Sequence, residues 1–276
     1  MKKEFDLIMY LIKWFILSLI IGILAGSASS FFLIILEWAT KTRESNPLLI
    51  YFLPVGGFIV SLMYYFWGKE VNKGNNLILD KIKKQQKRIK FRMAPMIFIG
   101  TVITHLFGGS AGREGSGVQI GASIADQLTF IFKLDDSDRK IILISGMAAG
   151  FGSIFGTPLA GAFFGLEVAV LGSFKYEALI PAFLSSVTAD IVSKNYWHIE
   201  HSVYNINFFP DITIKNIMLA CLAGVVFGLT GKIFSLGLNR AKAVFSKYIK
   251  FPPYRAVIGG VMLILMTKLA GSYVYN

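Results

Sequence analysis

The residues that could do chemistry lie in one glycine-rich stretch, residues 108–119. Five glycines fall within ten residues of it, and a single carboxylate, Glu114, lies among them. Apolar sequence precedes the stretch over residues 93–107 and also follows it, so the glycines interrupt the chain at membrane depth. Backbone amides are costly there unless they line a polar cavity. Ser116 and Gln119 have the spacing of a capping box, which predicts a helix that begins at Ser116 with its first amides open.

An open helix end of this kind is suited to binding an anion. It carries about half a positive charge, and glycine lets an anion approach the amide groups closely. The Glu114 carboxylate can occupy such a site itself, and can leave it when it is protonated or displaced. The stretch therefore predicts an anion site with Glu114 as its gate. The alternative is a turn that only packs membrane helices, with Arg113 and Glu114 as a surface ion pair.

The composition is that of a polytopic membrane protein. Apolar residues make up 54% of the 276 residues and charged residues 16%, and the mean hydropathy is +0.60. Several segments exceed the roughly 18 apolar residues that a spanning helix needs. The net charge of +12 comes from loops between apolar segments. Because cytoplasmic loops carry such an excess of Lys and Arg, the charge does not indicate nucleic acid.

The sequence contains no pattern typical of an enzyme or a metal site. The single cysteine, Cys221, lies in an apolar segment without a second cysteine to pair with, so no disulfide and no metal site is predicted. A nucleophile elbow and a phosphate-binding loop are both lacking from the sequence. We therefore predict that the protein is not an enzyme and binds no cofactor.

The apolar segments predict an all-α fold that mixes spanning helices with short, broken ones. Spanning helices are expected at residues 7–38, 48–67, 176–194, 212–248 and 256–273. Half-helices are expected at residues 77–84, 117–132 and 159–171. Transporters use such half-helices to aim a helix end at a site in the middle of the membrane. Asp138 is the expected cap of the helix that follows residues 117–132, and Thr157 with Pro158 the expected start of the next one.

The distribution of charge predicts the orientation in the membrane. Seven basic residues and no acidic residue lie in residues 81–92, which places this segment in the cytoplasm. The amino terminus, with Lys2 and Lys3, is assigned to the same side because the first two spanning helices form an even pair. We therefore predict a multi-pass protein of the inner membrane with a cytoplasmic amino terminus.

The sequence Gly-Arg-Glu-Gly at residues 112–115, followed by Val118 and Gln119, resembles the signature of the CLC family of anion channels and anion/proton antiporters. The resemblance implies that Glu114 is the external gating glutamate that also carries the proton. It further implies an anion path lined by Gly112, Arg113, Gly115 and Ser116. Family members usually have proline at the last of these positions, where this chain has serine.

Two further positions resemble the fluoride/proton antiporter branch of that family. Asn75 stands where chloride-handling members have a serine that binds chloride, since the segment reads Gly-Asn-Asn-Leu-Ile from residue 74. Glu167 is an ionisable group in an apolar helix, which marks a functional site by default, although a carboxylate that only packs the helix is the alternative. Chloride/proton antiporters have two glutamates in tandem here, whereas Val168 follows Glu167 in this chain.

The resemblance implies two inverted repeats, with residues 1–211 forming the first and residues 212–276 an incomplete start of the second. The chain is thus expected to be truncated at its carboxyl terminus. The expected function is fluoride export coupled to proton import. The alternatives are a chloride channel or chloride/proton antiporter, and a truncated membrane fragment that transports nothing. Expected partners are the fluoride or chloride ion, protons, the lipid bilayer and, as a possible assembly, a second copy of the chain in a homodimer.

Overall fold

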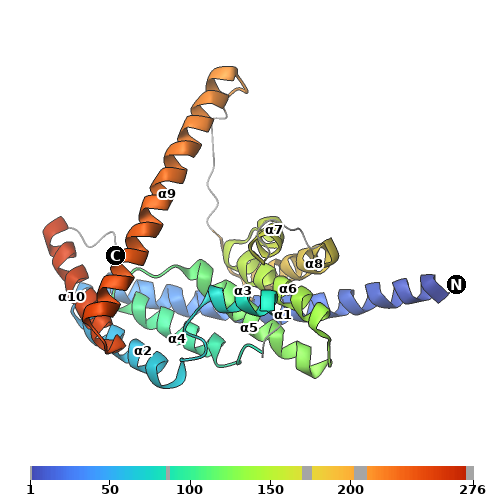
Figure 1. Ribbon diagram of the computed structural model, residues 1–276, viewed down its shortest axis with the longest axis horizontal. Coiled ribbons are helices and arrows are strands. Elements are labelled where there is room, and N and C mark those ends of the chain that lie inside the picture. The colour runs from blue at the N-terminus through green and yellow to red at the C-terminus, as the bar shows by residue number, and fades with distance from the viewer. Residues whose placement is uncertain (1, 85–87, 170–175, 202–209, 272–276) are drawn as a thin grey trace.

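The computed structural model describes residues 2–84, 88–169, 176–201 and 210–271, and Figure 1 shows their arrangement. In chain order the helices are α1 (Lys2–Ser45), the 3-10 turn η1 (Pro47–Phe52), α2 (Leu53–Trp67), α3 (Asn75–Lys84), α4 (Met93–Leu106), α5 (Arg113–Ile131), α6 (Asp136–Phe155), α7 (Pro158–Ala169), the 3-10 turn η2 (Tyr176–Ala178), α8 (Leu179–Ile191), the π-helical turn η3 (Val192–Tyr196), α9 (Ile214–Tyr248) and α10 (Pro252–Ala270). The described part of the chain contains no strand, so the predicted all-α class is confirmed.

Hydrophobic length accounts for the long elements. Four helical segments are long and apolar enough to cross a membrane: Glu4–Ser45, Pro47–Trp67, Ile214–Tyr248 and Pro252–Ala270. Shorter apolar helices lie at Met93–Leu106 and Pro158–Val168. The predicted half-helix at residues 77–84 is α3, and the predicted start at Pro158 is the first residue of α7. The mixture of spanning and broken helices is therefore confirmed. The spanning helix predicted at residues 176–194 is not among the four segments, because its α-helix, Leu179–Ile191, has only 13 residues.

One predicted helix cap is wrong. Asp138 does not cap α6, because the N-cap residue is Asp135, three residues earlier. The side chain of Asp135 accepts a hydrogen bond from the backbone amide of Asp138 at 2.8 Å. Asp138 instead lies in the first turn and forms an ion pair with Lys13 of α1, so a tertiary contact uses the side chain that the local pattern assigned to the cap.

Close packing of α5 on α6 forms the centre of the molecule. A methyl group added to Gly121 would lie 2.2 Å from the carbonyl oxygen of Gly146, and one added to Gly150 would lie 2.2 Å from that of Gly117. Contacts this short allow no side chain, so the glycines bring the two backbones together, as small residues commonly do between membrane helices. The helix that carries the glycine-rich stretch is thereby fixed to the core.

The helix α1 runs alongside this pair and packs against α4, α5, α6 and α8. Its Gly22 lies against Thr188 and its Gly26 against Ala189 of α8. Glycines four residues apart are the pattern expected at such a contact. This long helix therefore connects the two halves of the core, α4–α5 and α7–α8 (Figure 1).

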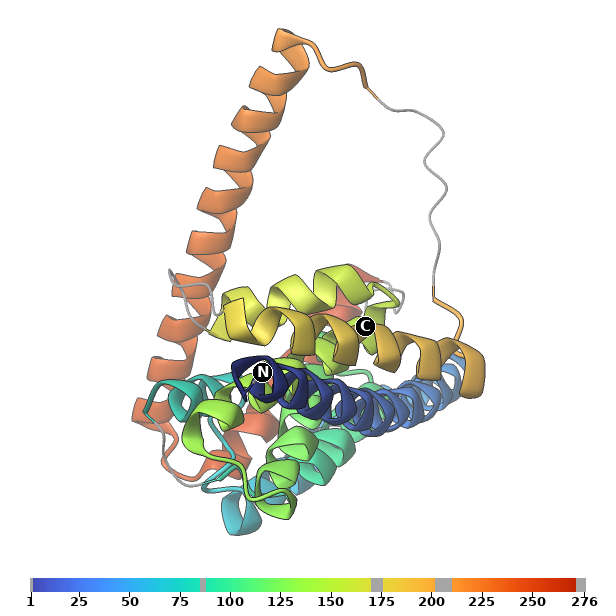
Figure 2. The ribbon, with the colours of Figure 1, turned by 90° about the vertical axis from the view of Figure 1, so that its right-hand side faces the viewer.

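The helix α9 differs from the rest, because none of its residues is buried. It stands away from the other helices in both Figure 1 and Figure 2. The next helix, α10, returns to the body and packs on α2, where a methyl group added to Gly260 would lie 2.9 Å from the backbone nitrogen of Pro54. The division into repeats at residue 211 remains a prediction.

Candidate functional site

The glycine-rich stretch begins as a tight turn at the end of α4. The amide of Gly108 donates to the carbonyl of His105 at 3.1 Å, and that of Gly109 donates to Thr104 at 2.8 Å. Gly108 has a φ of +79°, a left-handed conformation that glycine adopts without steric cost. The His105 ring nitrogen Nε2 lies 2.7 Å from the carbonyl oxygen of Ala111. The turn is thus tied back onto α4.

The helix α5 begins earlier than its sequence predicts. Its first residue is Arg113 and its N-cap residue is Gly112, so the predicted start at Ser116 is wrong. Ser116 is buried in the helix, and its hydroxyl lies 2.8 Å from that of Thr101 on α4. This tertiary contact explains the error, because the hydroxyl that was expected to cap the helix bonds across to α4 instead. Without a side-chain cap on Gly112, the first amides of α5 are open.

The Glu114 side chain folds back over this open end. A methyl group added to Gly112 would lie 2.6 Å from the Oε2 atom of Glu114, so the carboxylate occupies the space that only glycine leaves at the N-cap. Negative charge is stabilised at a helix amino terminus by the helix dipole. The side chain is exposed, so it can also leave this position. A negative group therefore lies at the open amino-terminal end of α5.

A second helix end meets the first. The helix α3 begins at Asn75, directly after Gly74 with its φ of +57°. The Nδ2 atom of Asn75 would lie 3.6 Å from a methyl group on Gly115, and the Gln119 amide lies at the same distance from that group. The Oε1 atom of Gln119 also lies close to Gly74. The structure thus brings Asn75 and Gly115 together, with Gln119 between the two helix ends.

The remaining predicted residues are less closely associated with the turn. Arg113 is exposed at the first position of α5. Glu167 is exposed on α7, and within the described residues no hydrogen bond or ion pair joins it to Glu114 or Asn75. The geometry thus assembles one site, which is formed by the ends of α3 and α5.

Comparison with known proteins identifies the family to which this chain belongs. The model of the voltage gated chloride channel family matches residues 56–275. This chain belongs to that family, the CLC family. It is 44% identical over 273 residues to a chloride/fluoride channel protein of Pseudomonas syringae pv. tomato, an alignment that covers 99% of this chain and 60% of the relative.

Solved CLC structures agree with the architecture. The crystal structure of a CLC-type fluoride/proton antiporter matches with a TM-score of 0.90 and 36% identity, over 95% of this chain and 66% of that one. A slow cyanobacterial Cl⁻/H⁺ antiporter matches with a TM-score of 0.71 and 20% identity, over 91% of this chain and 63% of that one, which shows the fold alone. The chain spans less than two thirds of the length of these relatives.

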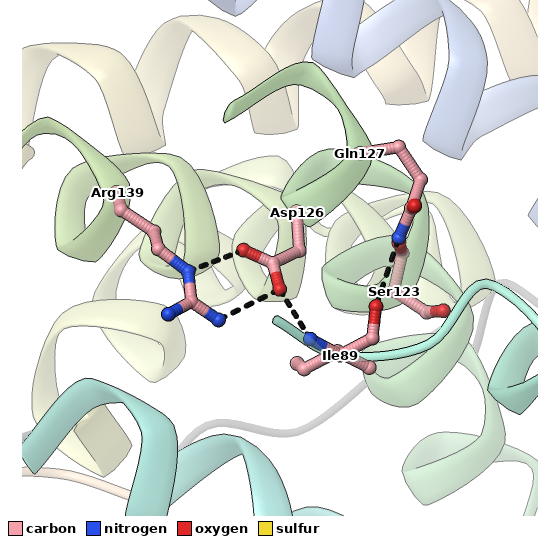
Figure 3. A network of polar contacts seen from close by, with 5 residues as sticks. All are labelled: Ile89, Ser123, Asp126, Gln127 and Arg139. Atoms are coloured by element: carbon pink, nitrogen blue, oxygen red, sulfur yellow. Dashed lines mark hydrogen bonds and ion pairs between the residues drawn. The ribbon is translucent and has the colours of Figure 1, made fainter. Parts of the chain in front are cut away.

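Sequence reasoning missed a buried network at the other end of α5 in this CLC chain (Figure 3). Asp126 is fully buried and accepts from Arg139 of α6, with Nε 2.6 Å from Oδ1 and Nη2 2.8 Å from Oδ2. Its Oδ2 atom also accepts from the backbone amide of Ile89 at 2.6 Å. The Gln127 side chain donates to the Ile89 carbonyl at 3.1 Å. An acidic residue inside an apolar predicted helix was the signal that could have indicated this network.

Further contacts hold the basic segment before α4. Glu70 forms ion pairs with Lys90 at 2.5 Å and with Arg92 at 2.8 Å. Hydrogen bonds from these two residues lower the pKa of the Glu70 carboxyl below its ordinary value. Arg88 lies over the Phe130 ring at 4.3 Å. The basic segment predicted to face the cytoplasm is thus held against the carboxyl-terminal end of α5.

Proposed function

We propose that this chain binds fluoride at the ends of α3 and α5 and exchanges it for protons across the membrane. One observation carries the proposal: the Glu114 carboxylate lies over Gly112 at the open end of α5. The same end is bordered by the Asn75 amide at Gly115. Carboxylate, helix end and amide together have the composition of an anion site that one protonatable group can occupy or vacate.

The mechanism follows from competition for the same amides. A charged Glu114 occupies the positive end of α5 and excludes a free anion. When Glu114 takes up a proton it loses this electrostatic attraction and leaves, and an anion can then bind to the amides of Arg113 and Gly115. When Glu114 releases the proton and returns, it displaces the anion. Proton and anion movement are coupled because both require the same carboxylate to move.

The Asn75 side chain supports fluoride rather than chloride as the transported ion. Its amide supplies two N–H donors, whereas a serine hydroxyl supplies one. Fluoride is small and strongly hydrated, so replacing its water requires a dense set of donors. The relatives named above as a chloride/fluoride channel protein and a fluoride/proton antiporter support the same choice. Chloride transport remains the alternative within the family.

The other predicted residues receive proposed roles by position. Gly112 and Gly115 allow the anion to approach the amides of the first turn. Arg113 adds positive charge at the mouth of the site, because it is exposed beside the gate. Glu167 is a secondary candidate, since a carboxylate on an apolar helix marks a functional site by default. We propose no enzymatic activity for the chain.

The charged segments support a proposed orientation. The basic residues held against Glu70 and Phe130 are assigned to the cytoplasm of an inner membrane. The amino terminus of α1 is assigned to the same side. Assembly as a homodimer is proposed from the family resemblance.

Ion efflux from liposomes tests the function. The 276-residue protein is reconstituted with fluoride or chloride inside, and ion-selective electrodes and an external pH electrode record both movements. Fluoride efflux with matching proton uptake is expected, and Glu114→Gln is expected to abolish the coupling. Glu37→Gln is the matched control, because Glu37 is an exposed carboxylate that pairs with Lys41 on α1; the Glu167→Gln variant tests the secondary candidate.

Each outcome of this experiment is informative. Chloride efflux in place of fluoride would contradict the inference from Asn75 and support a chloride transporter. Uncoupled fluoride efflux in the parent protein would indicate a channel. A folded protein that moves neither ion would mean that the 276-residue chain does not transport by itself.

A further inference from the structure

A pair of buried hydroxyl groups connects α4 to the first turns of α5. Thr101 is 8% exposed and Ser116 is 6% exposed, and their hydroxyl oxygens lie 2.8 Å apart. Both residues lie where α4 packs against α5. A hydroxyl in such a place is costly unless it is hydrogen-bonded, so this pair forms a specific link between the two helices.

The direction of the hydrogen bonds extends the link to the anion site. The Ser116 hydroxyl donates to the carbonyl oxygen of Gly112 at 3.4 Å. Either hydroxyl can donate across the 2.8 Å contact. When Ser116 donates to Gly112, Thr101 donates to Ser116, because a hydroxyl has one hydrogen to donate and can still accept. The resulting series of hydrogen bonds runs from Thr101 through Ser116 to Gly112, the N-cap residue. The Glu114 carboxylate lies beside Gly112.

The first turn of α5 requires such external support. Glycines occupy positions 112, 115 and 117, and glycine is among the weakest helix formers because its backbone is the most flexible. No side chain caps this end of the helix. A cap formed by a local side chain would also cover the amides that the proposed site needs. Hydrogen bonds from Thr101 to Ser116 and from Ser116 to the Gly112 carbonyl hold the turn without covering those amides.

We infer that Thr101 and Ser116 are positioning residues, which hold Gly112 and with it Glu114 at the anion site, and that the Ser116 hydroxyl is not a ligand of the anion. The inference rests on the proposed function, because it assigns roles within the same site. It replaces the anion-binding role that the sequence predicts for Ser116, since the structure shows its hydroxyl bonded to Thr101 and Gly112.

Hydrogen exchange measured by mass spectrometry tests the link without requiring transport. The 276-residue protein is placed in lipid nanodiscs, and the amides of residues 116–119, the first that are bonded within α5, are followed in Thr101→Val and Ser116→Ala. Loss of one hydrogen bond is expected to speed their exchange about three- to tenfold. The double variant is expected to match the single ones, because either substitution breaks the same chain.

Two further variants serve as controls. Thr104→Val removes a hydroxyl from the same helix, but that hydroxyl donates to the carbonyl of Gly100 within α4 at 2.7 Å. Its exchange over residues 116–119 is therefore expected to match the parent protein. Ser116→Thr keeps the hydroxyl and is expected to restore slow exchange. Equal exchange in Thr101→Val and the parent would overturn the inference.

Fluoride binding, measured calorimetrically in a Glu114→Gln background, separates positioning from ligation. Because Thr101→Val and Ser116→Ala loosen the same turn, they are expected to change fluoride affinity by the same factor. A tenfold loss in Ser116→Ala alone would identify Ser116 as a ligand and overturn the inference. With Glu114 present, both variants are expected to shift the pH profile of fluoride efflux equally. If the parent protein shows no efflux, the proposed function fails while exchange still decides whether the hydroxyl chain exists.

Discussion

The two ends of α5 are built in opposite ways. The amino-terminal end, residues 112–115, is glycine-rich, lacks a side-chain cap and is partly exposed. The other end is fixed by Asp126, which is fully buried and bonded to Arg139 and to the backbone of Ile89. The proposed exchange of an anion for the Glu114 carboxylate needs open amides on a helix that does not itself shift. The buried ion pair supplies the second condition while the glycines supply the first.

The largest expected effect comes from the fixed end. Asp126→Ala removes the buried carboxylate that is bonded to Arg139 and to the backbone of Ile89. Breaking a buried ion pair costs about 3–5 kcal/mol. Unfolding in mixed micelles with increasing dodecyl sulfate measures the change, and Glu37→Gln, which breaks an exposed pair, is the control expected to change stability by less than about 1 kcal/mol. Equal losses in the two variants would refute the proposed difference between the ends.

A substitution at the open end is expected to change ion binding more than it changes the stability of the fold. Asn75→Ser replaces two N–H donors by one hydroxyl beside Gly115. Loss of a hydrogen bond worth about 1 kcal/mol weakens binding about fivefold, so fluoride affinity should fall by this factor with unchanged unfolding. Calorimetric titration with fluoride and chloride measures it. A variant with unchanged preference would exclude Asn75 from selectivity.

Gly112→Ala tests whether the Glu114 carboxylate needs the space beside Gly112. The added methyl group would lie 2.6 Å from Oε2 of Glu114, so the flexible carboxylate must move away from the helix end. Alanine is also a poorer N-cap residue than glycine, by about 0.5–1 kcal/mol. We expect weaker proton coupling in the efflux assay with a stability loss below that of Asp126→Ala. Adding Glu114→Gln should remove any further effect on coupling.

The smallest effect is expected at Glu70, which lies near the fixed end but on the surface. Its carboxyl pKa is lowered by Lys90 and Arg92, so its ion pairs stabilise the fold at pH values above the unfolded pKa of about 4.3. This stabilisation is lost as the pH falls through the lower, folded pKa. Glu70→Gln should therefore unfold at a slightly lower temperature than the parent at pH 7, and at the same temperature near pH 3. A difference that persisted at pH 3 would show that packing rather than charge is responsible.

The sequence predicted the parts of this molecule that depend on local composition. Hydropathy indicated the spanning helices, and the glycines with Glu114 indicated the turn before α5. The start of α5 was missed because the capping pattern of Ser116 is local, whereas its hydroxyl bonds to Thr101, which lies fifteen residues earlier on another helix. The Asp126 network was missed for the same reason, since its partners Ile89 and Arg139 approach only when the chain is folded.

The packing of α1 also has a consequence for synthesis in the cell. Gly26 contacts Ala189 in the folded protein, yet 163 residues separate them in the sequence, the difference between 189 and 26. At about 5–20 residues per second, translation leaves about 10–30 s between the two. During that interval the α8 surface that Gly22 and Gly26 contact does not yet exist. The contact of α1 with α8 can therefore form only after the intervening helices have been made.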